Sequence, residues 1–256
     1  MTEQAKPKLA VHKFSSCDGC QLALLNMGDD LLALSQLVDI VHFAEAGPVV
    51  EEQEVDIALV EGSISTPEDL ERIAGIRKQS KYLISIGACA TSGGLQALRN
   101  MADTDAWVRS IYPRPDYLSV LDHSSPISDQ VQVDLELWGC PVNSGQVITA
   151  LRDLLSGVTP REDVQPVCME CKRQGVVCVM VSRNEPCMGQ ITRAGCGALC
   201  PTHGRGCYAC YGPAEQVNNR AVSNHFVEIG VTVEEVRLKF GLINSNAPAF
   251  KRARDG

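Results

Sequence analysis

Eight cysteines lie within only 43 residues, from Cys168 to Cys210, and this segment limits the fold more than any other part of the chain. It is rich in glycine and shows little apolar periodicity, so it has little material for a hydrophobic core. Bound metal would then have to supply much of its folding free energy. The eight residues are Cys168, Cys171, Cys178, Cys187, Cys196, Cys200, Cys207 and Cys210. Their number fits two four-cysteine metal sites.

The start of the chain predicts a cytoplasmic protein. Residues 1–13 hold no apolar signal core, and no apolar run in the sequence is long enough to cross a bilayer. Thiols stay reduced in the cytoplasm, so metal binding explains the twelve cysteines better than disulfides do. The formal net charge is -8, and the one basic block is the tail 251–254, which we expect to be solvated. A nucleic-acid partner is therefore disfavoured.

The first half of the chain alternates between strand and helix patterns. Apolar runs predict strands over 9–14, 38–44, 55–60, 82–86 and 134–138. Helical spacing predicts helices over 21–34, 67–79 and 143–155, and three prolines indicate a long connection over 101–130. This alternation predicts an α/β fold with a parallel sheet and right-handed crossovers.

The other four cysteines stand where predicted strands end. Cys17 and Cys20 follow the first strand, Cys89 follows the fourth, and Cys140 follows the fifth. The carboxyl ends of parallel strands meet at one edge of a sheet, so these four thiols can converge. Four thiolates suit a 4Fe-4S cluster or tetrahedral zinc. Glycine at positions 19, 87 and 139 would let backbone amides approach cluster sulfides.

A change of composition near residues 157–166 predicts a domain boundary, because Gly157, Pro160 and Pro166 frame a short charged stretch. We therefore expect one domain over 1–158 and a second over 159–256. Within the second domain, the apolar spacing of 217–240 predicts two short helices that pack on the cysteine-rich segment.

The cysteine spacing leaves two kinds of metal open. Paired C-x2-C elements also occur in zinc ribbons, so a zinc-stabilised interaction module without redox activity is one alternative. Cys140-Pro141 and Cys200-Pro201 are typical of cluster-binding loops, and no histidine has a regular ligand spacing. His203 fits a surface loop better than a ligand position.

The eight later cysteines divide most simply in sequence order. One set is Cys168, Cys171, Cys178 and Cys187, and the next is Cys196, Cys200, Cys207 and Cys210. Each set then holds one C-x2-C pair and spans few residues, which limits the loop-closure entropy. An interleaved arrangement stays open.

Six motifs distinguish the chain: Ser16-Cys-Asp-Gly-Cys20, Val60-Glu-Gly-Ser-Ile64, Gly87-Ala-Cys-Ala90, Trp138-Gly-Cys-Pro141, Thr192-Arg-Ala-Gly-Cys-Gly-Ala-Leu-Cys-Pro201, and the pair Cys207 and Cys210. Together they resemble the small subunits of nickel-iron hydrogenases, over nearly the whole chain. Within that family the chain is most similar to the cytoplasmic, multi-subunit type. That type includes sulfhydrogenase delta subunits and the methyl-viologen-reducing enzymes of methanogens.

The resemblance implies a flavodoxin-like parallel-sheet domain followed by a small, loop-rich iron-sulfur domain, with three 4Fe-4S clusters in all. By position, the proximal ligands are Cys17, Cys20, Cys89 and Cys140, the medial ligands are Cys196, Cys200, Cys207 and Cys210, and the distal ligands are Cys168, Cys171, Cys178 and Cys187.

The chain departs from the family pattern at several positions. Many periplasmic members have a histidine where Cys168 stands and only three medial cysteines, so a four-cysteine medial site implies 4Fe-4S in place of 3Fe-4S, with a lower potential. Gly19 stands where oxygen-tolerant members have an extra cysteine. Ser16 replaces a glutamate of many uptake enzymes, which weakens any proton role there.

The function implied is electron transfer. Hydrogen would be split at a nickel-iron centre on a separate large subunit, and electrons would pass through this chain to a flavin subunit that reduces NAD(P), or to a heterodisulfide reductase type module. A quinone-module subunit of a respiratory complex is the second alternative. Those subunits usually have adjacent cysteines at the first loop and lack the eight-cysteine domain, so Cys17, Cys20 and 168–210 disfavour it.

Overall fold

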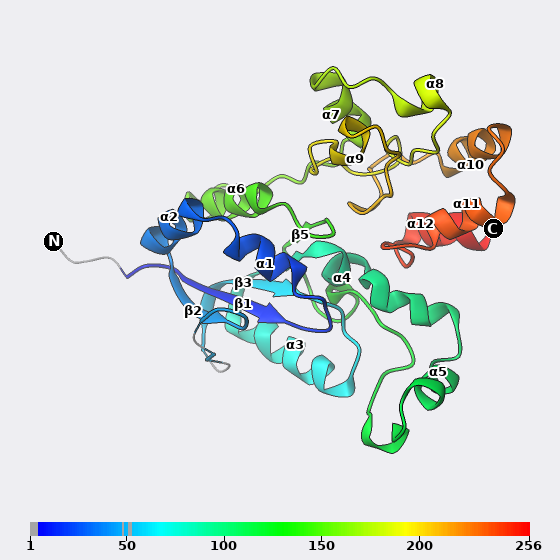
Figure 1. Cartoon of the computed structure of the whole chain (residues 1–256). Coiled ribbons are helices and arrows are strands. Elements are labelled where there is room, and N and C mark those ends of the chain that lie inside the picture. The colour runs from blue at the N-terminus through cyan, green and yellow to red at the C-terminus, as the bar shows by residue number, and fades with distance from the viewer. Residues whose placement is uncertain (1–4, 48, 51–52) are drawn as a thin grey trace.

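The computed structural model describes residues 5–47, 49–50 and 53–256. Its centre is a five-stranded, all-parallel sheet with the strand order β2-β1-β3-β4-β5 (Figure 1). The strands are β1 Lys8–Lys13, β2 Asp39–Phe43, β3 Val55–Glu61, β4 Ser80–Ile86 and β5 Leu135–Leu137. This is the order of flavodoxin-like folds, so the predicted α/β class is confirmed.

Helices connect the strands of the sheet, and one predicted helix differs from the structure. The helices include α1 Gly19–Leu25, α2 Asp29–Leu37, α3 Pro67–Gln79, α4 Gly87–Ser92 and α6 Ser144–Leu155. The single helix predicted over 21–34 is wrong, because Gly28 has a φ of 59° and separates α1 from α2. By contrast, α3 begins as predicted, with a capping box between Thr66 and Asp69 and proline at its first turn.

Apolar side chains pack on both faces of the sheet. On one face Val11 packs in a core that includes Leu151 of α6. On the other face its neighbour Ala10 packs in a core that includes Ile73 of α3. Successive strand residues point to opposite faces, so near-continuous apolar strands are what a sheet covered on both sides requires.

An arm leaves the sheet after α4. It contains the 3-10 helix η1 Gly94–Met101, α5 Thr104–Ile111, and the short turns η2 Pro115–Tyr117 and η3 Ile127–Asp129. In Figure 1, α5 lies at the far end of this arm, away from the strands. The predicted connection over 101–130 is thus partly helical.

The C-terminal region wraps short helices around cysteine-bearing loops. The helices are α7 Val167–Arg173, α8 Val179–Arg183, α9 Leu199–Thr202, α10 Asn219–Glu228, α11 Val233–Phe240 and α12 Pro248–Asp255. The two helices predicted over 217–240 are confirmed, and Phe226 and Phe240 pack against Met188 of the cysteine-rich segment. The basic tail 251–254 lies in α12, where Lys251 and Arg252 are exposed, as expected, and Arg254 is partly buried. The preceding Phe250 is buried in the same core. Among the described helices, none combines the length and apolar character needed to cross a membrane.

Candidate metal centres

The first group of cysteines lies at the carboxyl edge of the sheet. Cys17 precedes α1 and Cys20 lies in the first turn of α1, both after β1. Cys89 lies in α4, which follows β4, and Cys140 follows β5. We call these four residues the edge set.

Thiols of the edge set are close enough to affect one another's ionisation. Burial raises the pKa of Cys89 to about 12, and charge on Cys140 and Cys17 contributes to the rise. Burial also raises the pKa of Cys20, with smaller contributions that include charge on Cys89 and Cys140. Buried thiols of this kind stay protonated at neutral pH unless a cation offsets their mutual repulsion. The donor chemistry therefore fits a positively charged metal group.

Two glycines lie in close contact with these sulfurs. A Cβ on Gly87, which has a φ of 84°, would lie 2.3 Å from Cys20 Sγ. A Cβ on Gly94 would lie 2.6 Å from Cys89 Sγ. Any side chain at either position would therefore collide with a cysteine sulfur of the edge set.

Glu61, at the end of β3, fixes the backbone of the first loop. Its carboxylate oxygens accept hydrogen bonds from the amides of Cys20 at 3.1 Å and Gln21 at 3.0 Å. Burial raises the pKa of Glu61, while these two amide donors act in the opposite direction. Glu61 is only 1 % exposed, so its carboxylate serves the loop and not the solvent.

The eight later cysteines form two adjoining groups. The inner set is Cys196, Cys200, Cys207 and Cys210, and the outer set is Cys168, Cys171, Cys178 and Cys187. Cys168 and Cys171 lie on α7, Cys178 precedes α8, and Cys200 lies on α9. All twelve cysteines are free thiols.

Ionisation effects follow this grouping. Burial raises the pKa of Cys171 to about 11, and the largest charge contributions come from Cys168, Cys187 and Cys178 of its own set. Burial raises the pKa of Cys210 to about 12, and Cys196 makes the largest charge contribution. Cys207 differs, because Cys187 of the outer set makes its largest charge contribution, ahead of Cys210 of its own set.

The three sets follow one another in space. Charge on Cys140 of the edge set contributes to the raised pKa of Cys210 in the inner set. Charge on Cys196 of the inner set contributes in the same way to Cys171 of the outer set. Hydrogen bonds agree with the order edge, inner, outer, because Asn143 near Cys140 and Glu170 on α7 both bond to Gly195 beside Cys196.

Cys187 and Cys207 meet where the inner and outer sets adjoin. The amide of Cys207 donates to Cys187 Sγ at 3.2 Å, and the amide of Ala209 donates to Cys207 Sγ at 3.4 Å. Both cysteines are buried in one small core with Val167 and Val179. Amides directed at sulfur are the hydrogen bonds that tune cluster potentials.

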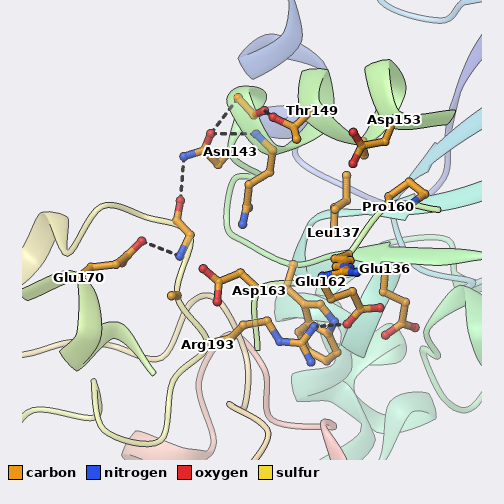
Figure 2. Close-up of a pocket in the computed structure, with 17 residues that line it drawn as sticks. Glu136, Leu137, Asn143, Thr149, Asp153, Pro160, Glu162, Asp163, Glu170 and Arg193 are labelled. Carbon is orange, nitrogen blue, oxygen red and sulfur yellow. Dashed lines mark hydrogen bonds and ion pairs between the residues drawn. The ribbon is translucent and has the colours of Figure 1, made fainter. Parts of the chain in front are cut away.

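Glu170, between two outer-set cysteines, holds the loop of the inner set. Its Oε1 accepts from the amides of Gly195 at 2.9 Å and Gly197 at 3.2 Å, and its Oε2 accepts from Ala198 at 3.0 Å. On the opposite side, Asn143 Nδ2 donates to the carbonyl of Gly195 at 2.7 Å (Figure 2). Asn143 caps α6, so the inner-set loop is bonded to the sheet region and to α7 at once.

Figure 2 also shows the cavity beside this loop, with a volume of about 410 Å³. It lies between α6 and the loop around Gly195, and an ion pair of 2.7 Å between Arg193 and Glu162 closes one side. Its lining includes no cysteine, so it is a cleft between the two regions and not a metal pocket.

Within the described part of the chain, no three histidine, cysteine, aspartate or glutamate side chains are grouped closely enough to hold one metal ion. Four thiolates share one ion in a structural zinc site, whereas each thiolate of a 4Fe-4S cluster binds a different iron.

The sequence pattern did not identify three residues that organise these groups. Glu61 had a weak signal, a carboxylate at the end of an apolar strand, but Glu170 and Tyr211 had none, because their contacts come from distant loops. His203 is exposed at the end of α9, as expected for a surface residue.

Comparison with known proteins begins with a family model. Residues 17–154 match the family described as NADH ubiquinone oxidoreductase, 20 Kd subunit. This match covers the sheet region after β1 and ends before the eight later cysteines.

Two relatives match a larger part of the chain than the family model does. The chain is 37% identical over 207 residues to the delta subunit of sulfhydrogenase 2 of Pyrococcus furiosus, covering 81% of this chain and 86% of the relative. It is 28% identical over 268 residues to a subunit of the F420-non-reducing hydrogenase of Methanocaldococcus jannaschii, covering 93% of each.

A solved structure of an NAD+-reducing NiFe hydrogenase in the H2-reduced state contains a similar chain. It has a TM-score of 0.56 and 30% sequence identity, over 61% of this chain and 94% of that one.

Proposed function

This chain belongs to the small-subunit family of nickel-iron hydrogenases, and on that premise we propose that its twelve cysteines hold three 4Fe-4S clusters that carry electrons away from a catalytic large subunit. Members of this family are electron-transfer subunits of multi-subunit hydrogenases. The edge set would hold the proximal cluster, the inner set the medial one, and the outer set the distal one.

The spatial order of the cysteine sets is the observation that carries this proposal. Asn143, three residues after Cys140, bonds to the carbonyl of Gly195 beside Cys196, and Glu170, beside Cys171 on α7, accepts from the amide of the same glycine. Successive sets would give a path with an entry at the sheet edge and an exit at α7 and α8. The clusters supply the redox chemistry, and the chain supplies burial, spacing and amide hydrogen bonds to sulfur.

An exposed apolar face on the arm supports docking of the nickel-iron large subunit there. Leu95, Trp107, Ile111 and Tyr117 are all exposed on η1, α5 and η2. The arm begins beside the edge set, because Gln96 Nε2 donates to the carbonyl of Ser15 at 2.7 Å, two residues before Cys17. A partner on this face would bring its catalytic centre next to the proximal cluster, and large exposed apolar patches mark such interfaces.

An NAD(P)-reducing flavin subunit is the acceptor we propose beyond the outer set. The similar chain of an NAD+-reducing NiFe hydrogenase supports this acceptor. The outer set is the natural exit, because Cys178 is exposed and Val177 and Val181 beside it are exposed apolar residues.

A quinone-module subunit is less well supported, although the matching family model is named for such a protein. That match ends at residue 154, whereas the hydrogenase relatives also cover the cysteine-rich region. A zinc-stabilised module is less well supported, because the relatives that cover the cysteine-rich region are hydrogenase subunits.

We divide the chain into a flavodoxin-like domain over 1–158, of which 1–4 lie outside the described residues, and an iron-sulfur domain over 159–256. The irregular segment after α6 supports this boundary. We also propose a cytoplasmic location.

Metal analysis of the purified complex tests the proposal. We expect about twelve irons per chain, counting four for each four-thiolate cluster. Zinc in place of iron would overturn the redox function. A chain with iron in the edge set alone would leave a hydrogenase subunit but contradict the three-cluster path.

A further inference from the structure

Tyr211 lies between the edge set and the inner set. It directly follows Cys210 and is only 6 % exposed. Its ring lies close to loops of both sets, at Gly139 beside Cys140 and at Gly195 beside Cys196.

Two glycines lie against the ring of Tyr211. A Cβ on Gly139, next to Cys140, would lie 2.9 Å from Cζ of the ring. A Cβ on Gly195, next to Cys196, would lie 2.9 Å from its Cε1. The two glycines have φ values of 143° and 133°, so their backbones also favour glycine. The ring thus packs against the backbone of a ligand loop from each set.

Hydrogen bonds hold these loops in place beside the ring. Asn143 holds the Gly195 carbonyl at 2.7 Å, and Glu170 holds the Gly195 amide at 2.9 Å. On the edge-set side, the carbonyl of Gly139 accepts from Ala88 at 2.7 Å, which ties it to the loop of Cys89. The Gly195 loop is thus bonded to α7 and to the sheet region, the Gly139 loop is bonded to that of Cys89, and the Tyr211 ring lies against both loops.

We propose that the ring of Tyr211 is the spacer that sets the separation of the proximal and medial clusters and keeps water out of the gap. Tyr211 is a positioning residue for electron transfer, and this role rests on the proposed function. In the step it supports, one electron leaves the reduced cluster of the edge set and reduces the cluster of the inner set. No bond forms or breaks, and no proton moves.

The ring carries this role, because the close contacts involve ring carbons. Replacement by leucine would leave a gap beside polar glycine backbone, and a polar gap of that kind admits water. Water would raise the local dielectric and shift the potentials of both clusters, which depend on burial. The two loops could also move together or apart.

The test compares Tyr211→Phe with Tyr211→Leu in the complete hydrogenase complex. The readouts are iron content, the spin-spin coupling of the reduced proximal and medial clusters in electron paramagnetic resonance, and the midpoint potentials. We expect Tyr211→Phe to keep the native coupling and potentials. We expect Tyr211→Leu to keep its iron, to alter the coupling, and to shift the midpoint potentials of both clusters, because water in the gap would raise the local dielectric.

Tyr208→Leu is the matched control, because Tyr208 lies in the same loop but is exposed, and should change none of these readouts. Unchanged coupling and potentials in an iron-loaded Tyr211→Leu complex would overturn the spacer role. Equal defects in Tyr211→Phe and Tyr211→Leu would assign the effect to the hydroxyl and also overturn it. A wild-type complex without iron in the two sets would instead contradict the proposed function itself.

Discussion

Glu170 illustrates how a residue without a metal-binding role can govern a metal site. Its two oxygens accept three backbone amides from 195–198, so one carboxylate shapes the whole turn that presents Cys196. Its charge also contributes to the raised pKa of Cys196 after burial. A negative charge this close to a cluster disfavours reduction.

We predict that Glu170→Gln raises the midpoint potential of the medial cluster. Removing the charge should shift it by about 1 kcal/mol, roughly 40 mV for one electron. Redox titration followed by electron paramagnetic resonance measures this shift. The control is Glu215→Gln, at an exposed residue beyond the inner set, which should leave the potential unchanged. A lower medial potential in Glu170→Gln would contradict the electrostatic account.

We predict that the burial of His12 makes folding stability depend on pH. His12 lies in β1, with its ring 4.4 Å from that of His42. Burial, followed by charge on His42 and Arg72, lowers the pKa of His12 to about 3. The unfolded chain binds this proton near pH 6.5, so between pH 6.5 and 3 it holds more protons than the folded chain. Folding stability therefore falls as the pH drops, by about 2 kcal/mol between pH 7.5 and 5.

The cluster-loaded His12→Gln chain should lose less stability over the same interval. Thermal midpoints at pH 7.5 and 5 measure the difference, and cluster lability in acid is common to both proteins. An equal drop in the two midpoints would show that His12 is not the acid-sensitive group.

At the level of residues, the sequence predicts which cysteines come together better than it predicts the residues that hold their loops. Cys17, Cys89 and Cys140 could be brought together by topology alone, because each follows a parallel strand. Tyr211 could not be found in that way, since its neighbours Gly139 and Gly195 lie far from it in sequence. Contacts between irregular loops leave no periodic pattern in the sequence.

At the level of elements, strands were easier to predict than helix ends. The five strands are continuous apolar runs, and all five were expected close to where they lie. The break at Gly28 was missed because leucines continue with helical spacing through 24–34. Helix α12 was missed because its charged residues outnumber its apolar ones, and a single buried Phe250 fixes it to the core.

The arm is the element with the clearest testable role. We predict that Trp107→Asp combined with Ile111→Asp weakens association with the nickel-iron large subunit. Loss of about 2 kcal/mol, or roughly thirtyfold in affinity, is typical for one central aromatic contact. Co-purification of the large subunit measures the loss, with iron content as the check on folding. Leu32→Asp, at an exposed residue of α2, is the matched control. Full association of the double variant would exclude the arm as the docking surface.

At the level of the whole molecule, the chain reverses the order of its last two cysteine sets. Residues 168–187 come first in sequence but lie farther from the sheet edge than 196–210. The chain therefore runs outward from the sheet and returns. Its return brings Cys207 against Cys187, which joins the two sets.

We predict that Cys168→Ser affects only the last step of the path. The distal signal in electron paramagnetic resonance should change and reduction of the physiological acceptor should fall, while the proximal and medial signals remain. Cys17→Ser should instead abolish acceptor reduction by hydrogen, provided that assembly with the large subunit is intact. A changed medial signal and an intact distal one in Cys168→Ser would reverse the assignment of the two sets.

Trp138 links the maturation of this protein to its direction of synthesis. It stands at the end of β5 but packs in the core that Phe226, Phe240 and Phe250 complete. A chain emerging from the ribosome makes the sheet first, so the core around this tryptophan is complete only when the last helices appear. A chain that stops before α10 would keep Arg193 and Gly212 against the ring but would lack the three phenylalanines. Such a chain would expose apolar surface beside Cys140, and cellular proteases remove destabilised chains of this kind.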